Sequence, residues 1–275
     1  MKNYSRWKAT LLASIGGTAI AGLALGNCDR FTLQPISFSG SVLQGNEIAG
    51  VTLTSFDDRG RTRTLKITDV QLDPQDATQE IYLYTVLDLR PDGQWQNFCL
   101  ADPDGVAKAI PLSGRWDSSG AHIDDGSITF ACTNGALAKC VRWGYKPWQT
   151  VNGQSLQDYH QACTRMVRAD YCGNGIGHTR NGTPIDVYDR LSLYHRTPYS
   201  GMTFEAAWDI DGAVFFDRPR FPEAIAQLQA ECPEKLTPQP HLSQAELDPR
   251  VTLPEALLFN DSFLHPPVPA GIVQN

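Results

Sequence analysis

The sequence predicts an α+β fold, in which a mainly antiparallel sheet carries two central helices packed on it and disulfide bonds cross-link the structure. Short runs rich in β-branched and aromatic residues fill the first half of the chain, and Asp, Pro and Gly turn sequences separate them. Two segments with a helical spacing of apolar residues follow. The chain has 275 residues, 41% of them hydrophobic, which is enough to bury a core. We expect one folded domain over residues 61–232.

Five runs in the first half have the composition of strands, because β-branched and aromatic residues suit a pleated, half-buried surface. They are Arg63–Thr68, Ile81–Leu87, Gln94–Cys99, Ala109–Leu112 and Ser127–Cys132. Short turn sequences stand between them, at Asp57–Gly60, Pro91–Gly93, Asp102–Gly105 and Asp124–Gly126. We therefore expect antiparallel strands joined by short loops.

Two helices are predicted next. The first runs from Gly135 to about Trp143, with Asn134 available as its N-cap. The second begins at Ser155, which forms an approximate capping box with Asp158, and runs to about Asp170. Its apolar stripe includes His160 and Asp170, and buried polar side chains of this kind need hydrogen-bond partners.

Past the second helix, a glycine-rich loop covers Gly173–Gly177 and a strand is predicted at Ile185–Asp189. A hairpin follows, in which Phe204–Ile210 and Ala213–Phe216 flank an Asp-Gly turn. Eight of the 18 prolines fall within residues 233–275. Because proline cannot continue a helix or a central strand, we expect this tail to be extended or disordered and the fold to end near Cys232.

The first 26 residues have the pattern of a secretory signal, with three basic residues followed by an uncharged apolar run. Two processing schemes stay open. Ala24 and Gly26 fit cleavage before Asn27, whereas Leu25–Cys28 is similar to a lipoprotein box, in which the signal ends at 27 and Cys28 carries the lipid anchor. Either scheme predicts export to the periplasm, the outer envelope or the medium, with membrane contact only through the signal or the lipid.

Residues 30–60 contain a five-residue spacing in which glycine follows a large apolar residue by two places, as in Phe38–Gly40. A solenoid needs several stacked copies of such a unit to bury a core. We therefore interpret the segment as short glycine-punctuated strands.

The formal net charge is −7, and removal of three basic residues with the signal changes it to −10. An acidic chain without a cluster of Lys or Arg repels phosphate backbones. We therefore expect no nucleic-acid partner.

Six of the seven cysteines lie inside the expected domain, and an exported protein oxidises such residues to disulfides. They are Cys99, Cys132, Cys140, Cys163, Cys172 and Cys232. A metal site is the weaker hypothesis, because these spacings are wider than those of structural zinc knuckles. We expect disulfides, no metal and no cofactor, and the pairing stays open.

Two hypotheses for a site remain. A hydrolase could use His160 or His178 as its general base, since an imidazole oriented by a carboxylate is the usual arrangement. The carboxylate could come from Asp170, Asp186 or Asp189. Asp186 and Asp189 flank the same region and are further candidate ligand-binding residues. Structural roles for these side chains, as turn-forming or core residues, are the alternative.

Aromatic residues are dense at residues 143–148, where Trp143, Tyr145 and Trp148 surround a glycine and a proline. Rings in an open loop can stack on a sugar or a peptide, and they can equally fill a core. Only the exposure of the rings separates these two interpretations.

Three consecutive segments, Phe130–Trp148, Tyr159–Gly173 and His178–Asp189, resemble the ADYC domain family, named after a motif that stands here as Ala169–Cys172. Similarity also extends to Ile110–Trp116 and Phe204–Trp208. The resemblance implies an exported bacterial protein without an assigned activity. The resemblance implies no mechanism. From the candidate loops at Trp143–Trp148 and Gly173–Asp189 we expect a non-catalytic binding or structural module that takes a carbohydrate or another envelope component, with the hydrolase as the alternative.

Overall fold

The computed structural model describes residues 32–33, 48–56, 61–197, 199, 201–236 and 253–264. The predicted signal at 1–26, Cys28 and the turn at residues 57–60 lie outside these residues, as do the first two units of the five-residue spacing. The described chain divides into two compact units rather than the one domain expected over 61–232. The first contains the residues up to Trp116 together with His122–Arg142, and the second contains Asp117–Ala121 together with the residues from Trp143 onward.

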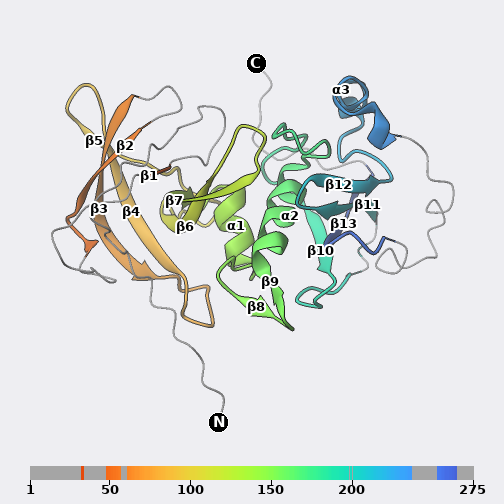
Figure 1. Ribbon diagram of the computed structural model, residues 1–275, viewed down its shortest axis with the longest axis horizontal. Helices are drawn as coiled ribbons and strands as arrows, with labels where there is room; N and C mark the ends of the chain where they lie inside the picture. Colours follow the sequence, from red (N-terminus) through yellow and green to blue (C-terminus); the bar gives the residue numbers. More distant parts are fainter. Residues whose placement is uncertain are drawn as a thin grey trace, which may run out of the picture. The chain divides into compact units, whose positions relative to one another are not determined.

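The first unit is an antiparallel sheet in the order β3-β2-β1-β7-β6-β4-β5 (Figure 1). Strand β3 also pairs with β4, so that the hydrogen-bonded order closes on itself and β5 extends from it. The strands are β1 (Thr32–Leu33), β2 (Thr52–Phe56), β3 (Thr62–Leu72), β4 (Tyr82–Leu89), β5 (Trp95–Asn97), β6 (Ala109–Trp116) and β7 (His122–Cys132).

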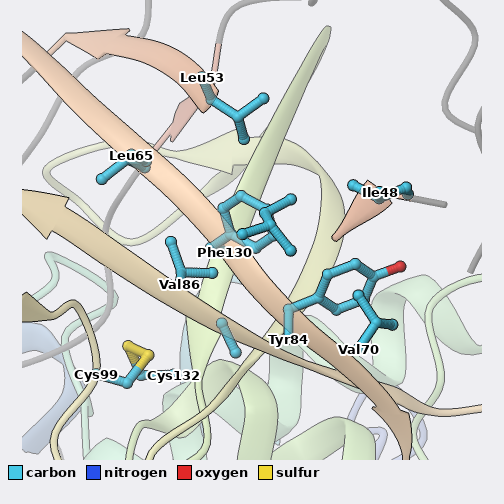
Figure 2. Packing of buried hydrophobic residues seen from close by; sticks show 11 residues of the cluster. Ile48, Leu53, Leu65, Val70, Tyr84, Val86, Cys99, Phe130 and Cys132 are labelled. Atoms are coloured by element: carbon cyan, nitrogen blue, oxygen red, sulfur yellow. A yellow bond between two sulfur atoms is a disulfide. The ribbon is translucent and has the colours of Figure 1, made fainter. Parts of the chain in front are cut away.

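Apolar side chains from most of these strands meet inside the closed sheet, because alternate residues of a strand point to the same face. Figure 2 shows Leu65, Val86 and Phe130 in this core, beside the disulfide between Cys99 and Cys132. That disulfide links the loop after β5 to the end of β7. Helix α1 (Ala136–Arg142) follows directly and packs on β7.

The second unit is built on a four-stranded antiparallel sheet in the order β10-β13-β11-β12 (Figure 1). Helix α2 packs against β11, β12 and β13, and the Cys172–Cys232 disulfide joins the loop after α2 to the end of α3. The elements are β8 (Thr150–Val151), β9 (Gln154–Ser155), α2 (Leu156–Arg168), β10 (Ile185–Asp189), β11 (Met202–Asp209), β12 (Gly212–Phe216), α3 (Ile225–Glu231), the 3-10 turns Pro222–Ala224 and Pro233–Leu236, and β13 (Leu258–Phe263).

Both ends of α2 are set by local sequence. Ser155 is the N-cap, and its side chain accepts a hydrogen bond from the amide of Gln157. At the other end Ala169 has a φ of 52°, in the left-handed region, and its N–H bonds the carbonyls of the last helical turn. This sharp reversal directs the next three residues of the motif, Asp170–Cys172, into the unit.

The α+β fold with a mainly antiparallel sheet is confirmed, and so are the disulfides. Cys99 pairs with Cys132 and Cys172 pairs with Cys232, while Cys140 and Cys163 are also disulfide-bonded. The predicted helices and the strands of the first half lie where the sequence placed them, although α3 was not predicted.

One local expectation is wrong. Asp124–Gly126 does not separate two strands but lies within β7, where the pairing with β6 shifts register. The turn between β6 and β7 is instead at residues 117–121, where the amide of Asp117 bonds the carbonyl of Ala121. An Asp-Gly pair is favoured in bulges as well as in turns, because both need positive φ at the glycine.

The expectation that the tail contains no central strand is also wrong, and the fold does not end at Cys232. Strand β13 lies between β10 and β11 and pairs with both of them. The prolines of the tail flank this strand, since none occurs between Pro254 and Pro266. The expectation was based on the proline content of all 43 residues of the tail. This average does not show that one run within the tail lacks proline and is long enough to form a strand.

Among the described residues, no helix combines the length and the apolar character needed to cross a membrane.

Because β13 is central, its apolar side chains should contribute to stability like any core residue. Phe259 is fully buried and stacks on Tyr188, with ring centroids 5.5 Å apart. We expect Phe259→Ala to lower the free energy of unfolding by about 3–5 kcal/mol, the usual cost of truncating a buried phenylalanine. Chemical denaturation measures this loss. Leu264→Ala, on an exposed side chain of the same segment, is the control and should change little; equal stability of both variants would contradict a central position for β13.

Candidate functional site

Asp170, the acidic residue of the ADYC motif, is paired with an arginine. Its Oδ2 atom accepts hydrogen bonds from Arg165 Nη1 at 2.7 Å and from the amide of Gly175 at 3.1 Å. Both side chains are almost completely buried. Arg165 also donates to the carbonyl of Ile210, in the β11–β12 turn. Asp170 thus joins the end of α2 to the glycine loop.

Tyr171, the next residue, enters a buried network that sequence reasoning missed. Its hydroxyl donates to Glu205 Oε1 at 2.9 Å and accepts from the amide of Arg220 at 2.6 Å. Arg220 forms a two-pronged ion pair with Glu205, at 3.0 and 2.9 Å, and it also donates to carbonyls of α2. The only sequence signal was a carboxylate in the middle of the apolar strand β11.

Burial and charge act against each other in this network. Burial would raise the pKa of Glu205, but the charge and hydrogen bonds of Arg220 outweigh it, so the pKa of Glu205 is lowered. Burial, with the Glu205 carboxylate beside it, raises the pKa of the Tyr171 hydroxyl well above its ordinary value. The network is therefore a fixed ion pair with a neutral phenol, which suits it to hold α2 on β11.

His178 is buried, and its acidic neighbour is a residue of α3. Its Nε2 lies 3.5 Å from Glu231 Oε2, the same oxygen that accepts a hydrogen bond from Asn174. Burial would raise the pKa of Glu231, but hydrogen bonds from Asn174 and Gln227 and the proximity of His178 lower it overall. His160, the other candidate histidine, is fully buried on α2.

The structure brings together Tyr145 and Asp189, which the sequence placed in two separate candidate loops. The Tyr145 hydroxyl donates to Asp189 Oδ2 at 2.9 Å, and both side chains are fully buried. Asp189 also accepts from the amides of Leu193 and Tyr194, at 3.1 and 2.9 Å. The carboxylate thus fixes the start of the loop that follows β10.

Asp186 fixes the other end of that loop. Its Oδ2 accepts a hydrogen bond from the amide of Thr197 at 2.7 Å. Directly opposite it in the pairing of β10 with β13 is Asp261, which accepts from Arg196 Nε at 2.8 Å and from the Tyr188 hydroxyl at 3.2 Å. Burial, and secondarily the Asp261 carboxylate, raise the pKa of Asp186.

These three carboxylates support what we call the aromatic loop, residues 190–197 and 199. Three of its side chains are large, apolar or aromatic, and face solvent, with exposed fractions of 39% for Leu193, 37% for Tyr194 and 54% for Tyr199. His195 is exposed as well. The ring of Tyr194 also contacts buried Tyr145, with centroids 6.0 Å apart. Asp186 and Asp189 were predicted from the sequence as candidate residues, whereas Asp261 and the loop itself were not.

The predicted aromatic residues differ in exposure. Tyr145 is a core residue, whereas Trp143 and Trp148 are half-buried. In the described part of the chain, no three His, Cys, Asp or Glu side chains gather in a way that could hold a metal ion. The arrangement thus offers exposed rings on a firmly held loop, above carboxylates that are already hydrogen-bonded.

The ADYC domain matches residues 45–222 of the sequence, more than half of the chain. The chain belongs to the ADYC domain family. No curated protein and no solved structure matches it. The match includes the motif at Ala169–Cys172 and the aromatic loop, but it ends before α3 and β13. In this ADYC protein, the partner of His178 and the partner of Arg196 therefore lie outside the matched region.

A double-mutant cycle tests the buried ion pair. Glu205→Gln leaves the Arg220 charge without its counter-ion, and we expect it to lower the free energy of unfolding by about 3–5 kcal/mol. Adding Arg220→Met removes the stranded charge, so the double variant should lose less than the sum of the single variants. The exposed pair Arg180–Glu223 supplies the control, because Glu223→Gln should cost no more than about 1 kcal/mol. If the losses of unfolding free energy from the Glu205 and Arg220 substitutions were strictly additive in the double variant, the pairing would be contradicted.

The raised pKa of Asp186 predicts a pH dependence with a definite sign. The pKa of this carboxyl group is higher in the folded state than its ordinary value of 3.8, which applies to the unfolded state. As the pH rises from 3.8 through the folded pKa, ionisation of the group therefore lowers the stability of the fold. Asp186→Asn should therefore gain stability relative to the wild type over this window, since the amide oxygen can still accept from Thr197.

The control for this titration is Asp125, whose pKa is shifted the other way. Partial burial would raise its pKa, but hydrogen bonds from Ser127 and Arg115 lower it. Asp125→Asn should therefore lose stability relative to the wild type as pH rises toward neutrality. Thermal denaturation between about pH 3 and 7 gives both trends, and equal slopes for the two variants would refute the assignment.

Proposed function

We propose that this ADYC protein is an exported, non-catalytic binding module that holds a carbohydrate of the cell envelope on its aromatic loop. The observation that carries the proposal is the loop itself, where exposed Leu193, Tyr194 and Tyr199 stand on a backbone fixed by buried carboxylates. Loops positioned by a rigid scaffold are the usual place for binding residues.

Pre-organisation favours binding at this loop. Three loop amides donate hydrogen bonds to Asp186 and Asp189, so a ligand would not have to order that part of the backbone on binding. Large tyrosine rings add contact area while losing few rotamers.

A carbohydrate fits the chemistry of the loop. Tyrosine rings combine an apolar face with a hydroxyl, and sugars present apolar C–H faces rimmed by hydroxyl groups. His195 and Arg196 are exposed beside these rings and can donate hydrogen bonds to such hydroxyls.

The hydrolase hypothesis has less support. The three candidate aspartates hold structural partners: Asp170 pairs with Arg165, Asp186 accepts from a loop amide, and Asp189 accepts from Tyr145. His178 has an acidic neighbour in Glu231, and a hydrolase at this position would use that pair. The His178 ring lies 6.0 Å from the ring of the motif residue Tyr171, centroid to centroid, so such a site would adjoin the motif.

Export is supported by the oxidised cysteines and by the signal pattern. Disulfides persist in the periplasm and in the medium and are rare in reducing compartments. Each of the two units contains a disulfide, Cys99–Cys132 in the first and Cys172–Cys232 in the second. Attachment through Cys28 would keep such a module at the envelope.

Binding is tested on a glycan array and on isolated peptidoglycan, with the full chain and with the double variant Tyr194→Ala/Tyr199→Ala. Loss of two aromatic anchors should weaken retention by about tenfold or more. Trp95→Ala is the control, because this ring is 40% exposed but lies in the first unit. Unchanged retention of the double variant would contradict the loop as the site, and hydrolysis of a retained glycan that is abolished by His178→Ala would contradict a non-catalytic role.

A further inference from the structure

The sheet of the second unit contains a slot that the C-terminal segment fills. Strand β13 pairs on one side with five residues of β10 and on the other with six residues of β11. Among the described strands, β13 is the one partner of β10. Without β13, the facing edges of β10 and β11 would present unpaired backbone N–H and C=O groups, which is the arrangement that accepts an added strand.

The slot is complementary to the sequence of this segment as well as to its backbone. Asn260 accepts a hydrogen bond from the indole nitrogen of Trp208 at 2.8 Å, and both residues are fully buried. Asp261 accepts hydrogen bonds from the Tyr188 hydroxyl and from Arg196 Nε, and Phe259 stacks on the Tyr188 ring. A strand without these side chains would leave buried donors unpaired, which costs free energy. The slot therefore selects the sequence around Phe259–Asp261.

Backbone contacts extend the docked segment toward its N-terminal side. Arg190 donates to the carbonyls of Ala256 and Leu253, and its own amide bonds the carbonyl of Leu257. The amide of Leu257 in turn bonds the carbonyl of Trp208. The segment Leu253–Leu264 thus docks as one piece, through contacts that another copy of the same segment could make equally well.

The covalent link between this segment and the rest of the unit is a single length of chain. Cys232 is the last cysteine of the sequence, so no disulfide ties the segment in place. Sixteen residues, 237–252, connect it to the end of the preceding 3-10 turn. A chain of this length can span at most roughly 50 Å, so its length does not confine the segment to the sheet of its own molecule.

From these observations we infer that the slot between β10 and β11 also accepts the Leu253–Leu264 segment of a second copy of this chain, giving a strand-exchanged dimer. Such exchange preserves the contacts of the closed monomer, so that its cost is chiefly that of association. In the dimer, Asp261 of each copy would hold Arg196 of the other, and each aromatic loop would be completed by its partner. This last consequence rests on the proposed function of the loop, but the exchange itself does not.

A cysteine trap on the full chain tests the exchange. Met202 and Phe263 are cross-strand partners at the end of the β11–β13 ladder, and both are half-buried. Directly opposed antiparallel residues have the Cα separation that a disulfide needs. Single variants Met202→Cys and Phe263→Cys, carrying different tags, are mixed at high concentration, warmed to near the onset of unfolding, cooled and oxidised.

Exchange predicts that the mixture yields a covalent heterodimer, in which mass spectrometry finds a cross-link between positions 202 and 263. Neither variant treated alone should give this cross-link. The double variant Met202→Cys/Phe263→Cys, oxidised before warming, should close within one chain and stay monomeric by light scattering. If the double variant closes but the mixture gives no 202–263 cross-link, the exchange is refuted. Neither result depends on glycan binding, so failure of the proposed function would be seen separately.

Discussion

The insertion of β13 between β10 and β11 is the constraint on which the second unit depends. It attaches β10 to the sheet, and β10 in turn carries Asp186 and Asp189, which hold the aromatic loop. It also supplies Asn260 to Trp208 and Asp261 to Arg196. One strand from the C-terminal part of the chain therefore links backbone pairing, core packing and the geometry of the candidate site.

The ADYC motif has a structural explanation at each position. Ala169 adopts the left-handed conformation that ends α2, Asp170 pairs with Arg165, and Tyr171 bonds the Glu205–Arg220 pair. Cys172 then joins the loop to α3 through Cys232. Loss of one member of a buried ion pair of this kind leaves an uncompensated charge, which disfavours other arrangements of the helix on the sheet. The motif therefore builds the scaffold, and the exposed loop lies elsewhere.

Sequence patterns predicted most of the local structure, because alternation, turn residues and capping residues act on neighbouring positions of the chain. Alternation and turn residues located the strands of the first half, and Ser155 located the start of α2. The central strand β13 was missed because its signal is six residues long and stands among prolines. Glu205 and Arg220 were missed because their pairing joins positions 15 residues apart, which no local periodicity reports.

The candidate site was predictable only in part, for the same reason. Asp186, Asp189 and Tyr145 were recognised as polar and aromatic candidates, and the structure shows that two of them bond each other. The role of the two aspartates, however, is to accept hydrogen bonds from the amides of a loop whose residues carry no motif, and Tyr145 donates to one of them. Exposure of Tyr194 and Tyr199 depends on the fold around them, and sequence alone does not determine exposure.

Hydrogen exchange of the amides of Leu193, Tyr194 and Thr197 in the full chain tests the central claim that buried carboxylates hold the aromatic loop. All three residues are exposed to solvent, yet each amide donates to Asp189 or Asp186. The account predicts that these three amides exchange much more slowly than those of an unstructured peptide, because exchange requires the hydrogen bond to open. Exchange at the rate of an unstructured peptide would contradict it.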